Sequence, residues 1–178
     1  MSCSTYSLKG IARGCKDSLG GIVKVWVAGD YDTARAAVTE SEGTVSINKT
    51  AVPTNFKVFN FFKNTGSMTS TLNVSENAGS SFSTELALVF MKQETAKRLE
   101  LMGLFMGQAL AVVKDANGKY WLLGHDNPVE ASAGTAQSGT ASTDLNGYNI
   151  TLRDDSRELP FEITDAETIT ALEAITIA

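Results

Sequence analysis

Histidine, cysteine and proline are scarce in this chain of 178 residues, which holds one His, two Cys and three Pro. A hydrolytic triad needs a nucleophile, a histidine and an acid that meet in space, and a structural zinc site needs closely spaced pairs of Cys or His. Cys3, Cys15 and the lone His125 fit neither pattern, and the Gly-His-Asp-Asn-Pro turn around His125 is typical of the surface. We therefore predict no catalytic residue, no metal site and no cofactor.

Positive charge and long apolar runs are also lacking. The chain has 15 Lys and Arg against 20 Asp and Glu, a formal net charge of −5, which argues against a general nucleic-acid binder. Its longest nearly apolar stretch, residues 101–113, is too short to cross a bilayer, and residues 1–20 lack the apolar region of a signal peptide. We expect no membrane partner, no secretion and no disulfide.

Hydroxyl side chains take the place of charge: Ser and Thr together number 35, whereas charged residues make up 20%. A hydrophobic fraction of 43% is enough for a core at this size, so residues 1–178 are expected to form a single domain. Residues 1–20 and 125–147 are rich in Gly, Ser and Ala without periodicity, and 129–143 in particular are predicted to form a loop or arm. We expect both segments to be flexible in an isolated subunit.

The clearest periodic pattern predicts a long β-hairpin over residues 67–90, with a turn at Glu76–Gly79. Apolar and polar side chains alternate on both sides of that turn. The alternation predicts that Leu72, Val74, Leu86 and Leu88 point to the core, whereas Thr69, Thr71, Ser81 and Ser83 face water. A second hairpin, with strands at 108–114 and 119–124, is predicted around Asn117-Gly118.

Other elements are shorter. We expect strands at 22–28, 44–47 and 56–63, a last strand pair at 148–152 and 159–163, and an optional short helix at 31–37. A helix over 92–106 is predicted from the spacing of Ala96, Leu99, Met102 and Met106, with Gly107 as its stop. A capping box at 164–167 predicts a short C-terminal helix. The predicted fold is mainly β (α+β): a sandwich or barrel of antiparallel hairpins with one flanking helix and a short C-terminal helix.

Charge is unevenly distributed along the chain. Residues 1–63 carry 8 basic and 5 acidic residues, whereas residues 125–178 carry 2 basic and 10 acidic residues. One interpretation is a solvated acidic face; the other is that the basic end of one copy meets the acidic end of another. The candidates for such contacts are Lys9, Arg13, Lys16 and Lys24 against Asp154, Asp155, Glu158 and Glu162.

The expected sheet edges also favour contacts between copies. Several strands in so short a chain leave edges, which are a liability unless they are covered or paired. A ring of identical copies pairs each edge with a neighbour.

Several segments, taken in order, resemble a known family. They are Gly14–Ile22 running into Lys24–Ala28, the Ser/Thr-rich hairpin, the Glu94–Met106 helix, Val112–Gly124 and Asn146–Leu152. Over most of its length the chain resembles the tail tube (major tail) proteins of tailed bacteriophages. The resemblance implies a β-sandwich or barrel with a flanking helix, assembled as hexameric rings that stack into a tube around a DNA channel.

The same resemblance implies a virion structural protein of the phage tail, made in the host cytoplasm. Its partners would be its own copies and other tail or portal-joint proteins, with DNA passing without specific binding and with no small-molecule ligand. The family offers no catalytic residues to carry over. Because the chain is compact, a ring at the head–tail joint or a tube terminator is also open.

A DNA channel should not bind phosphates, so a neutral or acidic lining is expected. The polar face of the 67–90 hairpin fits this expectation, because it carries no Lys or Arg. The candidates for residues that face the lumen are Thr69, Thr71, Asn73, Ser81, Ser83 and Glu85. The alternatives are a capsid decoration or other virion surface protein, a monomeric ligand-binding barrel and, least favoured, an enzyme.

Overall fold

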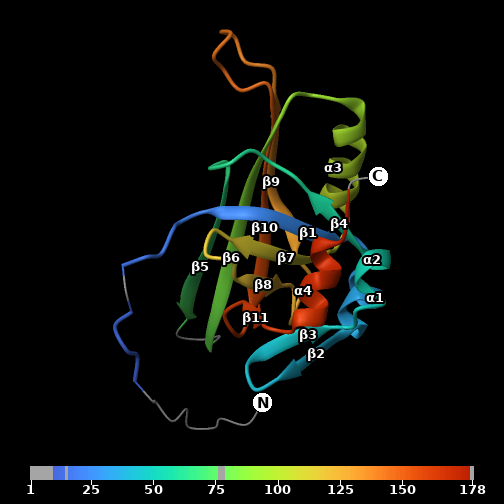
Figure 1. Cartoon of the computed structure of the whole chain (residues 1–178). Helices are drawn as coiled ribbons and strands as arrows, with labels where there is room; N and C mark the ends of the chain where they lie inside the picture. The colour runs from blue at the N-terminus through green and yellow to red at the C-terminus, as the bar shows by residue number, and fades with distance from the viewer. Residues whose placement is uncertain (1–9, 15, 76–78, 177–178) are drawn as a thin grey trace.

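The structure, a computed structural model, describes residues 10–14, 16–75 and 79–176. They form two β-sheets and four helices, so the predicted mainly β fold is confirmed (Figure 1). The helices are α1 (Tyr31–Ala36), α2 (Val52–Asn55), α3 (Thr95–Met106) and α4 (Ala166–Glu173). No helix in these three ranges has the length and hydropathy that a bilayer crossing requires.

Sheet A has seven strands in the order β2-β3-β11-β8-β7-β1-β4. Its strands are β1 (Ile22–Ala28), β2 (Val38–Ser41), β3 (Thr44–Ile47), β4 (Phe56–Phe59), β7 (Leu110–Asp115), β8 (Tyr120–Leu123) and β11 (Phe161–Ile163). The predicted second hairpin is confirmed as β7–β8. Asp115 Oδ1 accepts hydrogen bonds from Asn117 N and Lys119 N at 2.8 Å, and Gly118 takes the left-handed φ of 79° that its turn requires.

Sheet B has four antiparallel strands in the order β5-β6-β10-β9. They are β5 (Gly66–Ser75), β6 (Gly79–Met91), β9 (Glu130–Gln137) and β10 (Gly147–Ser156). The β5–β6 pairing confirms the predicted long hairpin, with Met68 opposite Leu86 and Leu72 opposite Phe82. Most of its predicted turn, residues 76–78, lies outside the described residues.

The molecule has three layers: sheet B, sheet A and a layer of helices. One core lies between the two sheets and includes the fully buried Val25, Leu86, Leu88 and Leu152. A second core, around Trp26, lies between sheet A and helices α1, α2 and α4. The central strands of sheet A are therefore buried on both faces, which explains their nearly continuous apolar sequence.

Helix α3 lies apart from the other helices and packs against β9 (Figure 1). Its existence and its end at Gly107 are confirmed, but the side chains that predicted it do not face the core. Leu101 and Leu104 are buried, whereas Leu99, Met102 and Met106 are exposed. The prediction chose the wrong face because α3 is apolar on two faces, and the spacing of apolar residues does not show which of them packs against the core.

Three other expectations are wrong. Strand β9 occupies Glu130–Gln137, where a loop was predicted. Its small residues allow α3 to pack closely on the strand: a Cβ on Gly134 would lie 2.7 Å from Phe105 Cε1. The last strand pair does not exist, since β10 joins sheet B and β11 joins sheet A. The cap of α4 is Asp165, whose carboxylate accepts from Thr168 N at 2.8 Å, and not Thr164.

Candidate assembly surface

The outer face of sheet B is a polar surface turned away from both cores. Alternate residues of β5 and β6 point to it because side chains alternate along a strand. Five of the six candidates for the lumen are exposed there: Thr69, Thr71, Asn73, Ser81 and Glu85. The sixth, Ser83, is buried at 7% exposure, which corrects the expectation that it faces water. Thr71 and Asp155, its neighbours in register, flank its short side chain.

Charge on this face is sparse and nearly balanced. Along β5, β6 and β10, the charged residues at outward positions are Glu85, Arg153 and Asp155. Arg153 Nε donates to Asp155 Oδ1 at 2.9 Å, so the one cation of these three strands is neutralised by its neighbour. The face therefore offers hydroxyl and amide groups with a slight negative charge.

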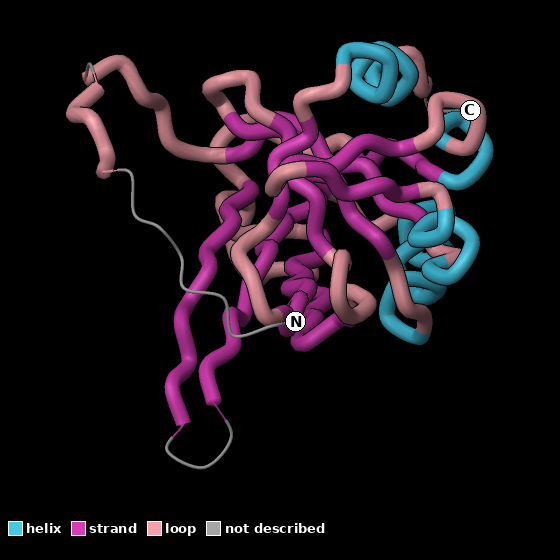
Figure 2. Tube along the Cα trace, turned by 90° about the horizontal axis from the view of Figure 1, so that it is seen from below, coloured by secondary structure: helices cyan, strands magenta, loops and turns pink. Residues whose placement is uncertain are grey.

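The inner face of the β5–β6 hairpin extends beyond the core. Leu86 and Leu88 are fully buried as predicted, but Leu72 is 52% exposed and Val74 is 73% exposed. The alternation placed them on the right face. The expectation of burial was wrong because the hairpin projects past sheet A, which leaves its far end without a covering layer (Figure 2).

Both edges of sheet B are long and open. Strand β5 pairs only with β6, and β9 pairs along its length only with β10, among the described residues. Val89 N donates to Thr65 O, a residue pair in the same register as β5–β6. In an antiparallel ladder, hydrogen-bonded and non-hydrogen-bonded residue pairs alternate, so the odd-numbered residues of β5 bond to β6 as Thr65 does. The backbone N–H groups of the even-numbered β5 residues, such as Ser70, therefore point away from β6.

The same reasoning orients β9. Lys92 N donates to Asn146 O, so the even-numbered β10 residues bond to β6 and the odd-numbered ones to β9. Thr135, opposite Asn149, therefore bonds to β10, whereas the N–H of its neighbour Ala136 points away from the sheet. Among the described residues, each edge thus presents backbone donors and acceptors that no further strand pairs.

The candidates for contacts between copies divide by exposure. Arg13 and Lys16 are exposed in the N-terminal segment, Glu158 is half-buried, and Asp155 stays 55% exposed although it pairs with Arg153, so these four stay candidates. Three others do not: Lys24 and Glu162 are in ion pairs within the chain that leave their side chains only 23% and 26% exposed, and Asp154 is buried at 2% exposure. Lys9 lies outside the described residues.

Lys24 belongs to a cluster that fastens α4 to sheet A. The Glu173 carboxylate accepts from Lys114 Nζ at 2.7 Å, from the Tyr120 hydroxyl at 2.7 Å and from Lys24 Nζ at 3.0 Å. Burial alone would raise the pKa of Glu173, but these three hydrogen bonds outweigh it and lower the pKa to about 2. Glu173 therefore stays ionised, and the cluster serves stability.

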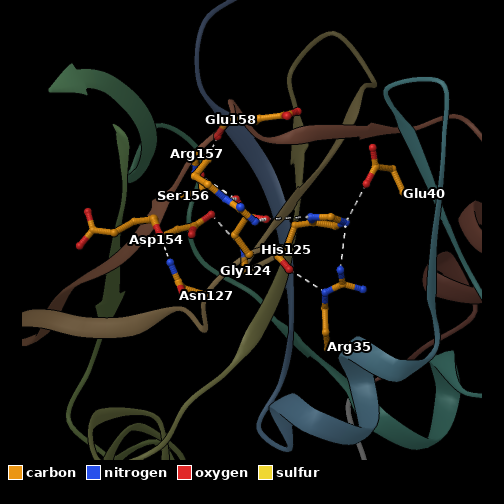
Figure 3. Close-up of polar contacts among 11 residues, drawn as sticks. Arg35, Glu40, Gly124, His125, Asn127, Asp154, Ser156, Arg157 and Glu158 are labelled. Atoms are coloured by element: carbon orange, nitrogen blue, oxygen red, sulfur yellow. Dashed lines mark hydrogen bonds and ion pairs between the residues drawn. The ribbon is translucent and has the colours of Figure 1, made fainter. Parts of the chain in front are cut away.

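His125 lies in a polar cluster at one end of the two sheets, not on the surface as expected (Figure 3). Its side chain is only 11% exposed and packs 4.5 Å from the Phe161 ring. Arg35 Nε donates to His125 O at 2.6 Å, and the Arg35 guanidinium lies 3.2 Å from His125 Nε2. These contacts link α1 with the turn after β8.

Asp154 joins the same region from sheet B. Its Oδ2 accepts from Gly124 N at 3.0 Å, and its Oδ1 has no hydrogen-bond partner in the structure. Burial raises the pKa of this carboxyl, and the nearby Asp126 and Asp155 charges add to the rise. Asp126 differs: burial would raise its pKa, but the Arg157 side chain and backbone N–H lower it. Asp154 thus links the two sheets, but its burial costs folding free energy whenever the carboxyl is ionised.

Clefts and ligand clusters offer little chemistry. Within the described ranges, no group of three or more His, Cys, Asp or Glu side chains is placed to hold a metal ion. A wide cleft of about 680 Å³ lies between the start of α1, the end of α3 and β9, and it is lined mostly by polar groups such as Asp30, Asp32 and Glu130.

Comparison of the chain with family models, with curated proteins and with solved structures gives no match.

Proposed function

We propose that this chain is a virion structural protein, a subunit of a ring that stacks into a phage tail tube or a head–tail ring through which DNA passes. One observation carries the proposal. A four-stranded sheet turns a weakly charged polar face to solvent and ends on both sides in a long open edge.

The directions of the two edge strands support closure into a ring. Sheet B is antiparallel throughout and has an even number of strands, so β5 and β9 run in opposite directions. If β5 of one copy pairs with β9 of the next, that new pair is antiparallel as well, and the pattern repeats without interruption. Such a contact is heterologous and closes when the rotation per copy divides a full turn.

The size of a ring of six copies is compatible with a DNA channel. Six four-stranded sheets would form a barrel of about 24 strands, and with strands about 4.8 Å apart and tilted by about 40° its backbone diameter is roughly 45–50 Å. A duplex of DNA passes through such a barrel with room for side chains. The outer face of sheet B would line it, and its hydroxyl groups, amides and excess acid would not hold phosphates.

Negative-stain microscopy of the purified full chain tests the proposal directly. We expect rings or tubes with six-fold symmetry and a stain-filled centre. Particles that stay monomeric or trimeric at high protein concentration would contradict the proposal and favour the decoration protein or the ligand-binding barrel.

An edge variant makes the test specific. Ala136→Pro removes a backbone N–H that faces away from the sheet, so the protomer should keep its fold while the edge loses a donor. We expect the variant to remain monomeric with an unchanged circular dichroism spectrum. Ala136→Thr, which keeps the N–H, is the matched control and should assemble normally. Normal rings from Ala136→Pro would show that this edge is not the interface.

A further inference from the structure

Helix α3 carries an apolar stripe that no described residue of its own chain covers. Leu99, Met102 and Met106 lie at i, i+3 and i+7, which places them on one face of the helix. That face is opposite Leu101 and Leu104, which pack into the core. Met106 is 83% exposed and Leu99 is 61% exposed. An exposed helix is normally polar on the side away from the core, so this stripe indicates a contact surface.

A second uncovered apolar surface lies on the inner face of the β5–β6 hairpin. Leu72 and Val74 continue the row that begins with Met68, which packs against the core. The strands around them carry no charge: residues 66–75 and 79–84 contain no Asp, Glu, Lys or Arg. A partner that covers Leu72 and Val74 therefore meets no charged side chain on these two strands; Glu76, which follows β5 in the sequence, is the nearest charge along the chain.

The two surfaces cannot cover each other within one copy. In Figure 1, the far end of the β5–β6 strands and α3 lie at opposite ends of the molecule. In sheet B they also belong to opposite edges, since the hairpin ends in β5 and α3 packs on β9.

We infer that the apolar stripe of α3 binds the inner face of the β5–β6 hairpin of a second copy, at Leu72 and Val74. The inference rests on the β5–β9 pairing proposed above. Gly134 is opposite Ile150, whose side chain is in the core, and Phe105 of α3 packs over Gly134. Helix α3 therefore lies on the core side of β9. A neighbouring β5 paired to β9 presents Leu72 and Val74 on that same side. Within one copy Gly66, and not Leu72, is level with Gly134, so the contact also requires a stagger of about six residues between copies, of the kind that tilted strands impose on a barrel.

The second copy is the occupant that the chemistry favours over the N-terminal segment. That segment also has exposed apolar side chains, Ile11 and Leu19, but it carries Arg13, Asp17 and Lys16 among them. Covering the α3 stripe with it would bring these charges against Leu99 and Met102. The hairpin strands around Leu72 and Val74 bring none, and Glu85 lies on their opposite face.

Disulfide trapping tests the contact in the full chain. In a background of Cys3→Ser and Cys15→Ser, each of Leu72 and Val74 is changed to Cys in combination with Cys at Leu99, Met102 or Met106. A bond requires Cα atoms within roughly 4.4–6.8 Å, so at least one of the six combinations should cross-link. Because every copy carries both cysteines on opposite sides, we expect a ladder of dimers, trimers and larger species under mild oxidation.

Two controls make the ladder interpretable. Thr71→Cys with Met102→Cys places one thiol on the outer face of the same strand and should give monomer only. All five test positions are exposed, so circular dichroism should show native folding of the reduced variants.

The outcomes separate this inference from the proposed function. Rings or tubes without a ladder from any combination would overturn the contact and leave the ring proposal standing. A ladder without rings or tubes would support the contact and contradict the ring. A ladder from the Thr71 control as strong as the others would show random collision, which also overturns the contact.

Discussion

Sheets A and B solve the problem of exposed strand edges in different ways. Sheet A ends in two strands of four residues each, β2 and β4, and both of its faces are covered. Sheet B ends in strands of ten and eight residues, β5 and β9, and one of its faces meets water. Short edges and covered faces protect a sheet from pairing with other chains, and long open edges invite it. Sheet A is therefore protected against pairing with other chains, whereas the described edges of sheet B are open to it.

The difference is visible in sequence. Strand β1, Ile22–Ala28, and β7, Leu110–Asp115, are nearly continuous apolar runs because two layers cover them. The β5–β6 hairpin alternates because only one of its faces is covered. In a sheet buried on both faces, a row of hydroxyl side chains on the second face would lose its hydrogen bonds to water.

The largest expected effect comes from breaking the core between the sheets. Leu88→Ala should lower the free energy of unfolding by about 2–5 kcal/mol, because Leu88 is fully buried and the cavity would not close. Leu72→Ala, on the same face but 52% exposed, should change it by less than about 0.5 kcal/mol. Urea denaturation measures both. Equal losses would mean that the hairpin is covered along its whole length in the isolated protein.

Removing the carboxylate that holds α4 to sheet A should have the next largest effect. Glu173→Gln should cost roughly 1–2 kcal/mol, less than the pKa shift alone suggests because the side chain is a third exposed. The folded-state pKa of Glu173 is lowered to about 2, so its contribution is present above about pH 4.5 and is lost as pH falls toward 2. Thermal unfolding at pH 7 and pH 2.5 should therefore separate the two proteins at pH 7 and bring them closer at pH 2.5.

Asp154 should act in the opposite direction. Burial raises the pKa of Asp154 in the folded state, so the folded protein binds this proton more tightly than the unfolded chain does. Ionisation then costs stability, and the cost is present at neutral pH and vanishes below the ordinary pKa of 3.8. Asp154→Asn keeps an oxygen for Gly124 N and should raise the unfolding temperature at pH 7. A lower unfolding temperature would mean that the charge itself is needed.

The smallest expected effect is on the rate of assembly. Asp155→Lys should slow assembly at low salt, and adding Lys16→Glu should restore part of the rate, because both residues are exposed and oppositely charged. At about 0.15 M salt, exposed charges more than roughly 8 Å apart are screened, so the difference should shrink as salt is added. Light scattering follows the rate. An unchanged rate for the single variant at low salt would exclude this pair.

Sequence reasoning succeeded where one rule dominated the local structure. Alternation placed the β5–β6 hairpin and the correct face of Leu72, and Asn117-Gly118 placed the β7–β8 turn. It failed where a tertiary contact decided the outcome. Strand β9 has no alternation of its own, and its small residues make sense only once Phe105 packs over Gly134.

The candidate assembly residues were predictable, or not, for the same reasons. The hydroxyl pattern indicated the outer face of sheet B, but pattern alone could not show that Ser83 is shielded by its neighbours in register or that Asp154 is buried. Charge counts along the chain could not show that Lys24 is already paired with Glu173, since the two are separated by 149 positions. The apolar spacing of α3 predicted a helix and did not distinguish its two faces.

The opposite directions of β5 and β9 also determine how a defective copy behaves. A chain whose β9 edge is blocked, as in Ala136→Pro, still has a normal β5 edge to offer to an intact neighbour. Once attached, it provides no edge for the next copy, so growth stops in that direction and the ring stays open. A minority of such chains in a mixture with the intact protein should therefore act as caps, so that the fraction of rings left open exceeds the fraction of defective chains.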